Sequence, residues 1–165
     1  IISMGSSMGT GIAANTAVNR KCAAVLLVAP YASLAQAARD NLSFFKIYPS
    51  FLFPQPDLTC LPLMASNKQP IVIIHGALDQ RIPVTHSRQL VAAYKSSHHL
   101  KDQAEDQLKD LALGQPSKQD QDSNLRYVEL ANCHHGDIAL DILTDELNGI
   151  VTRLETSKKT LLSTK

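Results

Sequence analysis

The sequence has no excess of charge of either sign and few aromatic residues. Its 165 residues include 16 Lys or Arg against 15 Asp or Glu, and neither sign dominates a long stretch. This balance gives no reason to expect nucleic acid or an acidic surface as a partner, and it fits a small neutral substrate better. With 44% hydrophobic and 19% charged residues, the composition excludes disorder, collagen and coiled coil and is typical of one soluble globular unit.

Long apolar runs and paired cysteines are also missing. The longest runs, such as residues 22–30 and 70–74, are far shorter than the about 20 apolar residues that cross a membrane. Cys22, Cys60 and Cys133 are odd in number and widely spaced, which argues against a disulfide framework and a zinc site. No glycine-rich phosphate loop or dinucleotide fingerprint occurs. We therefore expect free thiols in a reducing, cytoplasmic compartment, with no metal and no cofactor.

Strand and helix patterns alternate along the chain. Apolar runs that predict strands are residues 1–4, 23–29, 71–74 and 125–130. Apolar residues at helical spacing predict helices over residues 12–18, 84–94 and 137–155. His75, at the end of a predicted strand, and His86, in the first turn of a predicted helix, are interpreted as structural. The alternation predicts a parallel α/β sheet.

Two segments depart from this alternation. Residues 44–62 carry four prolines, which forbid a long regular element, and we interpret them as an apolar excursion over the strand ends. Four side chains of this segment have two open interpretations, either lining an acyl pocket or only packing against their neighbours. They are Phe51, Leu52, Phe53 and Leu61. Residues 98–124 are polar and contain a Gly-Gln-Pro-Ser break, which predicts a surface insertion.

Residues 5–9 read Gly-Ser-Ser-Met-Gly and match G-x-S-x-G, a motif in which a strained strand-to-helix turn lifts a serine clear of the backbone. An apolar strand pattern precedes it and a small-residue helix pattern follows it, which is the context that the motif requires. We expect both glycines to be needed, because a side chain at either would collide with the neighbouring strand or helix. Ser7 is therefore the predicted nucleophile, in preference to Ser6; the alternative is an ordinary turn serine.

A serine hydroxyl needs a base to take its proton and a carboxylate to orient that base. Asp79 follows a predicted strand and precedes a predicted helix, which suits the acid, and a loop or helix-capping Asp is the alternative. His134 and His135 follow the last strand, and either could be the base. A metal site at these histidines would need further ligands, and only Cys133 lies near them in sequence.

Together these motifs resemble the C-terminal half of an α/β-hydrolase-fold serine hydrolase of the abhydrolase-domain type. The resemblance rests on the order Ser, Asp, His, on Gly-Ala-Leu-Asp at residues 76–79, and on residues 128–137 around the paired histidines. It implies a three-layer, mostly parallel α/β sheet with helices on both faces and N-terminal strands missing. Residues 1–165 would then be the C-terminal part of one such domain, and the strand before Ser7 would be an exposed edge.

The resemblance also implies roles for single residues. Ser7 would be the nucleophile, His135 the base with His134 as its alternative, and Asp79 the acid. The Met8 N–H would be one oxyanion donor, while the other comes from the N-terminal half of the fold. The implied function is hydrolysis of carboxylic esters or thioesters through an acyl-enzyme, with a small acyl substrate and the missing N-terminal half as partners. Alternatives are a serine peptidase of the same fold, a non-catalytic binding domain, or an inactive fragment.

Overall fold

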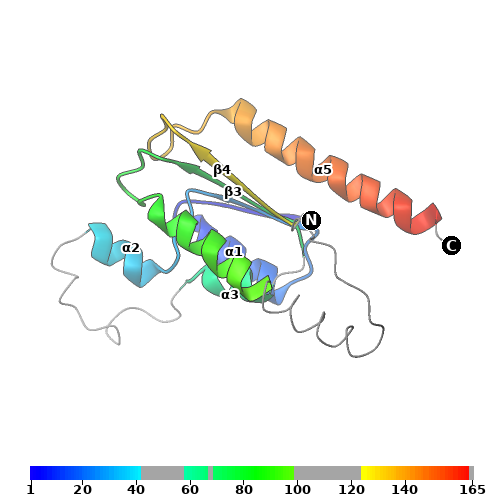
Figure 1. Ribbon diagram of the computed structural model, residues 1–165, viewed down its shortest axis with the longest axis horizontal. Helices are drawn as coiled ribbons and strands as arrows, with labels where there is room; N and C mark the ends of the chain where they lie inside the picture. Colours follow the sequence, from blue (N-terminus) through cyan, green and yellow to red (C-terminus); the bar gives the residue numbers. More distant parts are fainter. Residues whose placement is uncertain (42–57, 67–68, 99–123, 164–165) are drawn as a thin grey trace, which may run out of the picture.

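A parallel sheet of four strands organises the chain, in the order β1-β2-β3-β4 (Figure 1). The computed structural model describes residues 1–41, 58–66, 69–98 and 124–163. The strands are β1 (Ile2–Ser6), β2 (Ala24–Val28), β3 (Ile71–Gly76) and β4 (Leu125–Leu130). Since every neighbouring pair is parallel, the carboxyl ends of the strands share one edge of the sheet, and the segments that follow them meet there.

Helices cover both faces of this sheet (Figure 1). They are α1 (Gly9–Asn19), α2 (Leu34–Asn41), α3 (Leu61–Ser66), a helix over residues 85–98, and α5 (Leu140–Ser163). On one face lie α1, α3 and the 85–98 helix, and on the other lies α5. The predicted parallel α/β architecture with helices on both faces is confirmed.

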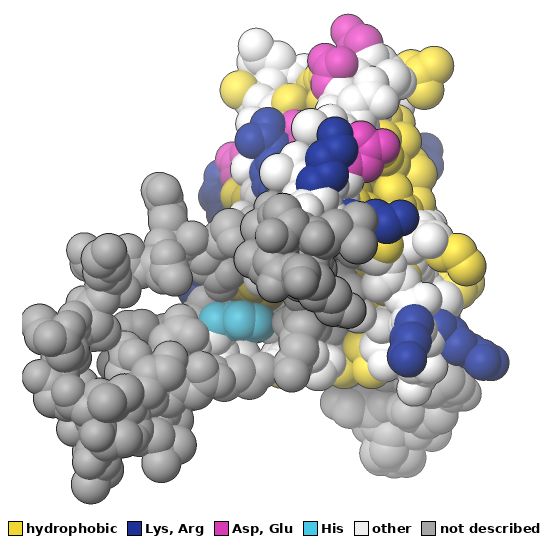
Figure 2. All heavy atoms as spheres, turned by 90° about the vertical axis from the view of Figure 1, so that its right-hand side faces the viewer, with side chains coloured by type: hydrophobic (Ala, Val, Ile, Leu, Met, Phe, Trp, Pro, Cys, Tyr) yellow, Lys and Arg dark blue, Asp and Glu magenta, His cyan; other side chains and the backbone are white. Residues whose placement is uncertain are grey.

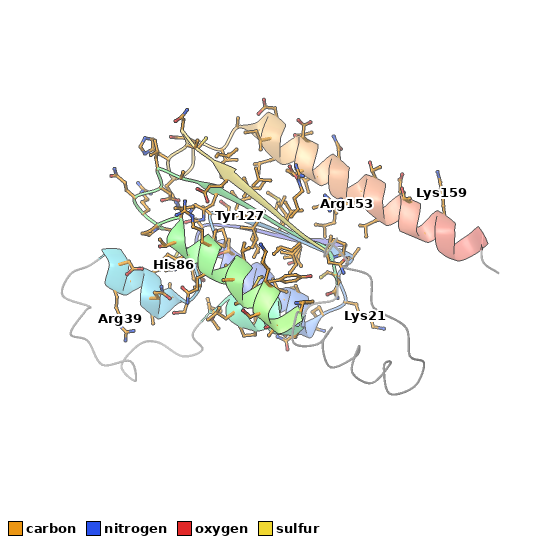
Figure 3. All side chains as sticks on the ribbon, viewed as in Figure 1. Lys21, Arg39, His86, Tyr127, Arg153 and Lys159 are labelled. Carbon is orange, nitrogen blue, oxygen red and sulfur yellow. The ribbon has the colours of Figure 1, made fainter. Side chains whose placement is uncertain are left out.

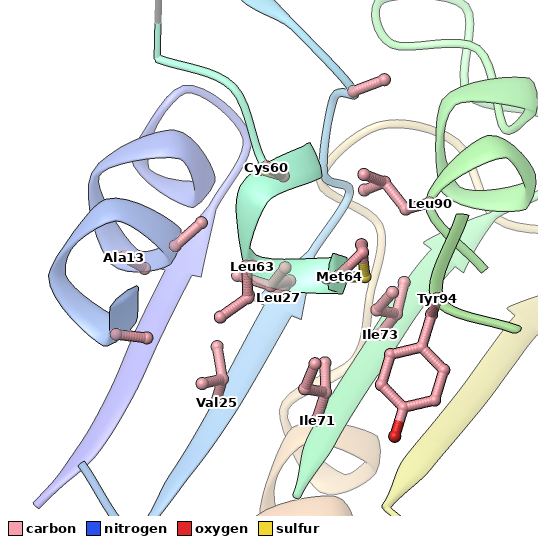
Figure 4. Close-up of a cluster of buried hydrophobic side chains, with 13 residues drawn as sticks. Ala13, Val25, Leu27, Cys60, Leu63, Met64, Ile71, Ile73, Leu90 and Tyr94 are labelled. Atoms are coloured by element: carbon pink, nitrogen blue, oxygen red, sulfur yellow. The ribbon is translucent and has the colours of Figure 1, made fainter. Parts of the chain in front are cut away.

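The central strands β2 and β3 are buried along their whole length. On β2, Val25 and Leu27 pack with α1, α3 and the 85–98 helix (Figure 4), whereas Leu26 and Val28 pack with α5. Successive side chains of a strand point to opposite faces, so a strand with a helical layer on each side needs an apolar residue at every position. This explains the uninterrupted apolar runs of the sequence.

The last helix begins later than its sequence pattern predicts. The pattern covers residues 137–155, whereas α5 spans Leu140–Ser163. The difference at its start has a local cause, because Asp137 is used in a turn. Its N–H donates to the His134 carbonyl oxygen at 3.3 Å, and its carboxylate accepts from the His134 N–H at 3.2 Å. The residues before α5 therefore hold the segment that carries His135.

The helix predicted over residues 84–94 covers residues 85–98, so His98 ends a helix and does not open the predicted polar insertion. Its ring stacks on Tyr94, with the ring centroids 3.8 Å apart. Residues 99–123 of that insertion lie outside the described residues, as do residues 42–57 with Phe51, Leu52 and Phe53.

Charged side chains of both signs mix on the outer surface of α5. Figure 2 views the molecule from the side on which α5 ends and shows Lys and Arg beside Asp and Glu over this helix. Within the described ranges, none of the helices is both long and apolar enough to cross a membrane.

Cys22, Cys60 and Cys133 are free thiols. Burial raises the pKa of Cys60 to about 12, which leaves that thiol protonated and unreactive at neutral pH.

Strand β1 lies at an edge of the sheet, as the resemblance implies. Among the described strands it pairs with β2 alone. Met4 on this strand is 47% exposed. A groove of about 560 Å³ follows the same edge. Its lining residues are Ile1, Ile2, Ser3, Met4, Thr16, Arg20, Lys21 and Cys22.

The steric prediction for the two motif glycines is half right. A Cβ on Gly5 would lie 2.5 Å from the Gly9 carbonyl oxygen and 2.8 Å from the Ala13 Cβ, so the close contact of β1 with α1 requires glycine there. A Cβ on Gly9 would meet nothing within 4 Å in the described part of the chain, so the expectation for Gly9 is wrong. The contact is made by the Gly9 backbone, and its missing side chain points into open space.

This difference gives a matched pair of variants. We expect Gly5→Ala to lower the free energy of unfolding by about 1–3 kcal/mol, because the new methyl group must displace backbone. Gly9→Ala should leave it nearly unchanged, because its methyl group meets no neighbour. Urea unfolding followed by circular dichroism measures both, and an equal loss in the two variants would contradict the assignment.

Candidate active site

The turn between β1 and α1 holds Ser7 in a strained conformation. Its φ angle is 51°, in the left-handed region that non-glycine residues rarely occupy. Three hydrogen bonds hold it there. The Ser7 N–H donates to the Val28 carbonyl oxygen at 2.9 Å, and the Ser7 carbonyl oxygen accepts from the N–H and hydroxyl of Thr10 at 3.1 and 2.6 Å. The turn is therefore fixed by β2 on one side and by the start of α1 on the other.

Asp79 lies three residues beyond the end of β3, in a loop that curls back on the strand. Its N–H donates to the Gly76 carbonyl oxygen at 3.2 Å. One carboxylate oxygen, Oδ1, accepts from the N–H groups of Arg81 and Ile82 at 2.8 and 2.9 Å. The side chain of Asp79 is fully buried, so these backbone donors replace the water that it lost. The carboxylate is thus held by the loop that carries it.

Backbone contacts tie the loop after β3 to the loop after β4. The N–H groups of Ala77 and Leu78 donate to the carbonyl oxygens of Leu130 and Cys133 at 2.8 and 3.0 Å. A Cβ on Gly76 would collide with the Cys133 carbonyl oxygen, so this approach depends on glycine. The close approach brings Asp79 next to the segment with the paired histidines.

Ser7, His135 and Asp79 form one chain of hydrogen bonds at the carboxyl ends of the strands. His135 Nδ1 lies 2.6 Å from Asp79 Oδ2, and His135 Nε2 lies 2.9 Å from Ser7 Oγ. The carboxylate only accepts, so Nδ1 carries the proton and Nε2 accepts from the serine hydroxyl. His135 stands 56 residues from Asp79 and 128 from Ser7, so the tertiary fold alone brings the three together.

Asp79 is ionised in this arrangement. Burial by itself raises the pKa of the carboxyl group. The N–H of Ile82, the His135 ring and the N–H of Arg81 outweigh burial, so the net result is a pKa below the ordinary value of 3.8. A buried negative charge therefore faces the His135 ring at neutral pH.

The adjacent histidine has a different partner. His134 Nδ1 lies 3.0 Å from the Leu78 carbonyl oxygen, and the His134 N–H donates to Asp137. Its ring therefore bridges the two loops. Of the two histidines that the sequence offers as the base, the structure brings His135 to Ser7 and directs His134 to Leu78.

Met8, the predicted oxyanion donor, is the N-cap residue of α1 and has no side-chain cap. The residue is 57% exposed. The N–H groups at a helix N-terminus carry partial positive charge. The backbone at Met8 thus provides a positive dipole end directly after Ser7.

Two residues that the sequence did not single out support the turn. The hydroxyl of Tyr31, a buried residue, donates to the Met8 carbonyl oxygen at 3.3 Å, and the Thr10 hydroxyl donates to the Ser7 carbonyl oxygen at 2.6 Å. Each residue has a signal in the sequence. Tyr31 follows the end of the strand beside β1, and Thr10 stands three residues after Ser7, a spacing at which a threonine hydroxyl reaches a backbone carbonyl oxygen.

His86 holds a separate contact near α2 (Figure 3). Its Nδ1 accepts from the Ala32 N–H at 3.2 Å, and its Nε2 lies 2.9 Å from Asp40 Oδ2. The ring is fully buried, and burial lowers its pKa. These contacts join α2 and the segment after β2 to the 85–98 helix, in agreement with the structural interpretation of this histidine.

Of the predicted acyl-pocket residues, Leu61 lies within the described chain and packs against the core cluster between the sheet and α1. The groove along β1 is lined by none of Ser7, Asp79 and His135. Within the described ranges, no group of three His, Cys, Asp or Glu side chains is placed to hold a metal ion.

Comparison with known proteins finds no matching family model. Two uncharacterized proteins of Mycobacterium tuberculosis, from strains CDC 1551 and H37Rv, are each 33% identical over 89 residues. The match covers 54% of this chain and 31% of each relative, so the chain spans under a third of the curated relatives' length.

Solved structures give likenesses of fold. An esterase of Pyrococcus furiosus matches 95% of this chain and 53% of its own, with a TM-score of 0.57 and 15% identity. An acylaminoacyl peptidase of Pyrococcus horikoshii matches 82% of this chain and 20% of its own, also with a TM-score of 0.57 and 15% identity. The esterase domain of a Rhodothermus marinus protein matches 85% and 53%, with a TM-score of 0.52 and 13% identity. The chain therefore has an α/β-hydrolase-like fold and spans about half of the two esterases.

Proposed function

We propose that this chain carries the catalytic residues of a serine hydrolase that cleaves carboxylic esters or thioesters. One observation carries the proposal, namely the unbroken line of hydrogen bonds from Asp79 through His135 to Ser7. The left-handed φ of Ser7 supports it, because a nucleophile elbow strains its serine in this way. The α/β-hydrolase-like fold adds support, since its members in the comparison include esterases and a peptidase.

In the first half of the reaction, Ser7 Oγ attacks the acyl carbonyl carbon and its proton passes to His135 Nε2. Asp79 holds the ring with Nε2 toward Ser7 and stabilises the imidazolium that forms. The imidazolium then protonates the leaving alcohol or thiol as the ester bond breaks. In the second half, His135 takes a proton from water, the hydroxide attacks the acyl-enzyme, and the acid leaves as Ser7 regains its proton.

Negative charge on the carbonyl oxygen needs donors during both halves. The Met8 N–H follows the nucleophile at the uncapped start of α1 and is the donor that we assign. The resemblance assigns the second donor to the N-terminal half of the fold. Loss of one such donor costs about 10²–10³ in rate, so the rate of this chain depends on whether a second donor is present.

A serine peptidase is the second candidate, and the likeness to the acylaminoacyl peptidase supports it. We favour esters because the P. furiosus esterase matches more of this chain, 95% against 82%. Hydrolysis of p-nitrophenyl acyl esters, measured beside the corresponding aminoacyl p-nitroanilides, separates the two. A larger kcat/KM for the anilides would reverse the choice.

The proposal is tested by labelling with a fluorophosphonate, which reacts only with an activated serine. We expect one covalent adduct, located on Ser7 by mass spectrometry, and no adduct on the Ser7→Ala protein. Ser6→Ala is the matched control and should label as the wild type does, because Ser6 lies in the β1 ladder opposite Val28. If the folded wild type does not label, the hydrolase proposal fails and a non-catalytic binding domain or an inactive fragment becomes the better interpretation.

A further inference from the structure

A second histidine contacts the carboxylate of Asp79 from inside the protein. His75 belongs to β3 and is fully buried. Its Nε2 lies 3.3 Å from Asp79 Oδ2, the same oxygen that His135 Nδ1 approaches at 2.6 Å. The sequence suggested only a structural residue at the end of a strand. The shared oxygen instead connects His75 to the chain of hydrogen bonds that ends at Ser7.

The partners of the His75 ring decide which nitrogen carries its proton. Nε2 also lies 2.8 Å from the Ile82 carbonyl oxygen, so it faces two oxygens that can only accept. Nδ1 lies 2.5 Å from Ser87 Oγ, a hydroxyl that can donate. A neutral ring with its proton on Nε2 donates to the Ile82 carbonyl oxygen and holds the same N–H 3.3 Å from Asp79 Oδ2, while its Nδ1 accepts from the Ser87 hydroxyl. The Ser87 hydroxyl thereby selects the tautomer that donates toward Asp79.

The neutral form of His75 agrees with its surroundings. Burial is the largest influence and lowers the pKa of the ring, against the opposing effects of the Ile82 carbonyl group and Asp79. The other charged or titratable groups that act on it are His86 on the 85–98 helix and Glu129 on β4, its register partner. A neutral ring adds no positive charge beside Asp79, so the full negative charge of the carboxylate remains available to His135.

We propose that His75 is a positioning residue that holds the Asp79 carboxylate in the orientation that His135 requires. The inference rests on the function proposed above. The N–H groups of Arg81 and Ile82 hold Oδ1, and the His75 N–H adds a donor near Oδ2 and anchors the Ile82 carbonyl group. Rotation of the carboxylate is then restricted at both oxygens. The loop after β3 is thereby built around an ionised Asp79 aimed at His135.

Two substitutions at His75 separate positioning from packing. His75→Leu fills the space but removes the donor, whereas His75→Gln keeps a side-chain N–H that can reach Asp79. In His75→Leu we expect fluorophosphonate labelling of Ser7 to slow by about tenfold, because a misaligned carboxylate no longer orients the base. His75→Gln should recover most of the rate. Thermal unfolding of each variant reports the packing contribution separately.

Two further measurements respond to positioning and not to stability. The proton shared by His135 Nδ1 and Asp79 gives a downfield resonance in the proton NMR spectrum, which should be present in the wild type and His75→Gln and lost in His75→Leu. Steady-state hydrolysis of a p-nitrophenyl ester should show a lower kcat and an unchanged KM in His75→Leu, because a misaligned Asp79 orients the base poorly and leaves substrate binding unaltered. A lower melting temperature in His75→Leu with the resonance and kcat unchanged would overturn the proposal.

The NMR measurement also keeps this inference separate from the proposed function. If the wild type does not label but its resonance is lost only in His75→Leu, the hydrolase proposal fails and the positioning of Asp79 stands. If His75→Leu does not fold, Ser87→Ala decides, because it removes the hydroxyl that selects the tautomer and leaves the ring in place. A weakened resonance in Ser87→Ala supports the proposal, and an unchanged one overturns it.

Discussion

Replacement of His135 by alanine should lower kcat for ester hydrolysis by about 10⁴–10⁶-fold, while His134→Ala should lower it by no more than about tenfold. The reason is that His135 Nε2 is the nitrogen 2.9 Å from Ser7 Oγ, whereas His134 Nδ1 lies 3.0 Å from the Leu78 carbonyl oxygen. Without His135, the Ser7 proton has no acceptor as Oγ attacks. Without His134, one hydrogen bond between the two loops is lost.

The neighbouring histidines serve as controls for each other. Both variants change the same turn, so comparison of their melting temperatures corrects for damage to the loop. Initial rates with a p-nitrophenyl ester, supported by fluorophosphonate labelling, give the two effects. A larger loss of activity in His134→Ala than in His135→Ala would mean that the other histidine is the base and that the hydrogen-bond line in the structure is not the reactive arrangement.

Asp79→Asn should lower kcat by about 10⁴-fold with little change in KM, because an amide no longer fixes the His135 tautomer or stabilises the imidazolium. The amide oxygen can still accept from the N–H groups of Arg81 and Ile82, so the loop keeps part of its support. Its NH₂ group, however, would face the protonated Nδ1 of His135. Steady-state kinetics measures the loss, and an unchanged kcat would remove Asp79 from the mechanism.

The same variant tests the ionisation of Asp79. Its pKa in the folded protein is lower than the ordinary value of 3.8, so the unfolded chain binds the proton more tightly than the folded protein does. The ionised carboxylate therefore contributes stability that is present above about pH 4 and is lost as the pH falls through the lowered pKa. The stability difference between wild type and Asp79→Asn should be constant near neutral pH and narrow in acid. Urea unfolding across this range checks it, and a difference that widens in acid would contradict the assigned ionisation.

Much of the fold could be predicted because its signals are local. An apolar residue at every position of β2 identifies a strand covered on both faces, and the parallel order follows from alternation with helices. Less could be predicted at the ends of elements, where single contacts decide. Helix α5 begins at Leu140 and not at residue 137, because Asp137 hydrogen-bonds to His134.

Some residues of the candidate site could likewise be predicted from local patterns, whereas others depend on tertiary contacts. Ser7 and Asp79 stand out in sequence because a glycine-bounded turn and the end of a buried strand are short-range patterns. His134 and His135 are adjacent, so no periodicity distinguishes them, and their partners Leu78 and Ser7 come from other loops. The contact of His75 with Asp79 was equally hidden, since it depends on how the loop after β3 curls back over its own strand.

By itself the sequence determined the parallel α/β architecture and a short set of candidate residues, because hydrophobic periodicity and turn motifs are properties of neighbouring residues. Only the tertiary structure decided which histidine meets Ser7, which of the motif glycines is sterically required, and that His75 shares the carboxylate of Asp79. These outcomes depend on distances of about 3 Å between groups on different strands. Such distances arise when the carboxyl ends of parallel strands are packed together, and the order of residues along the chain does not encode them locally.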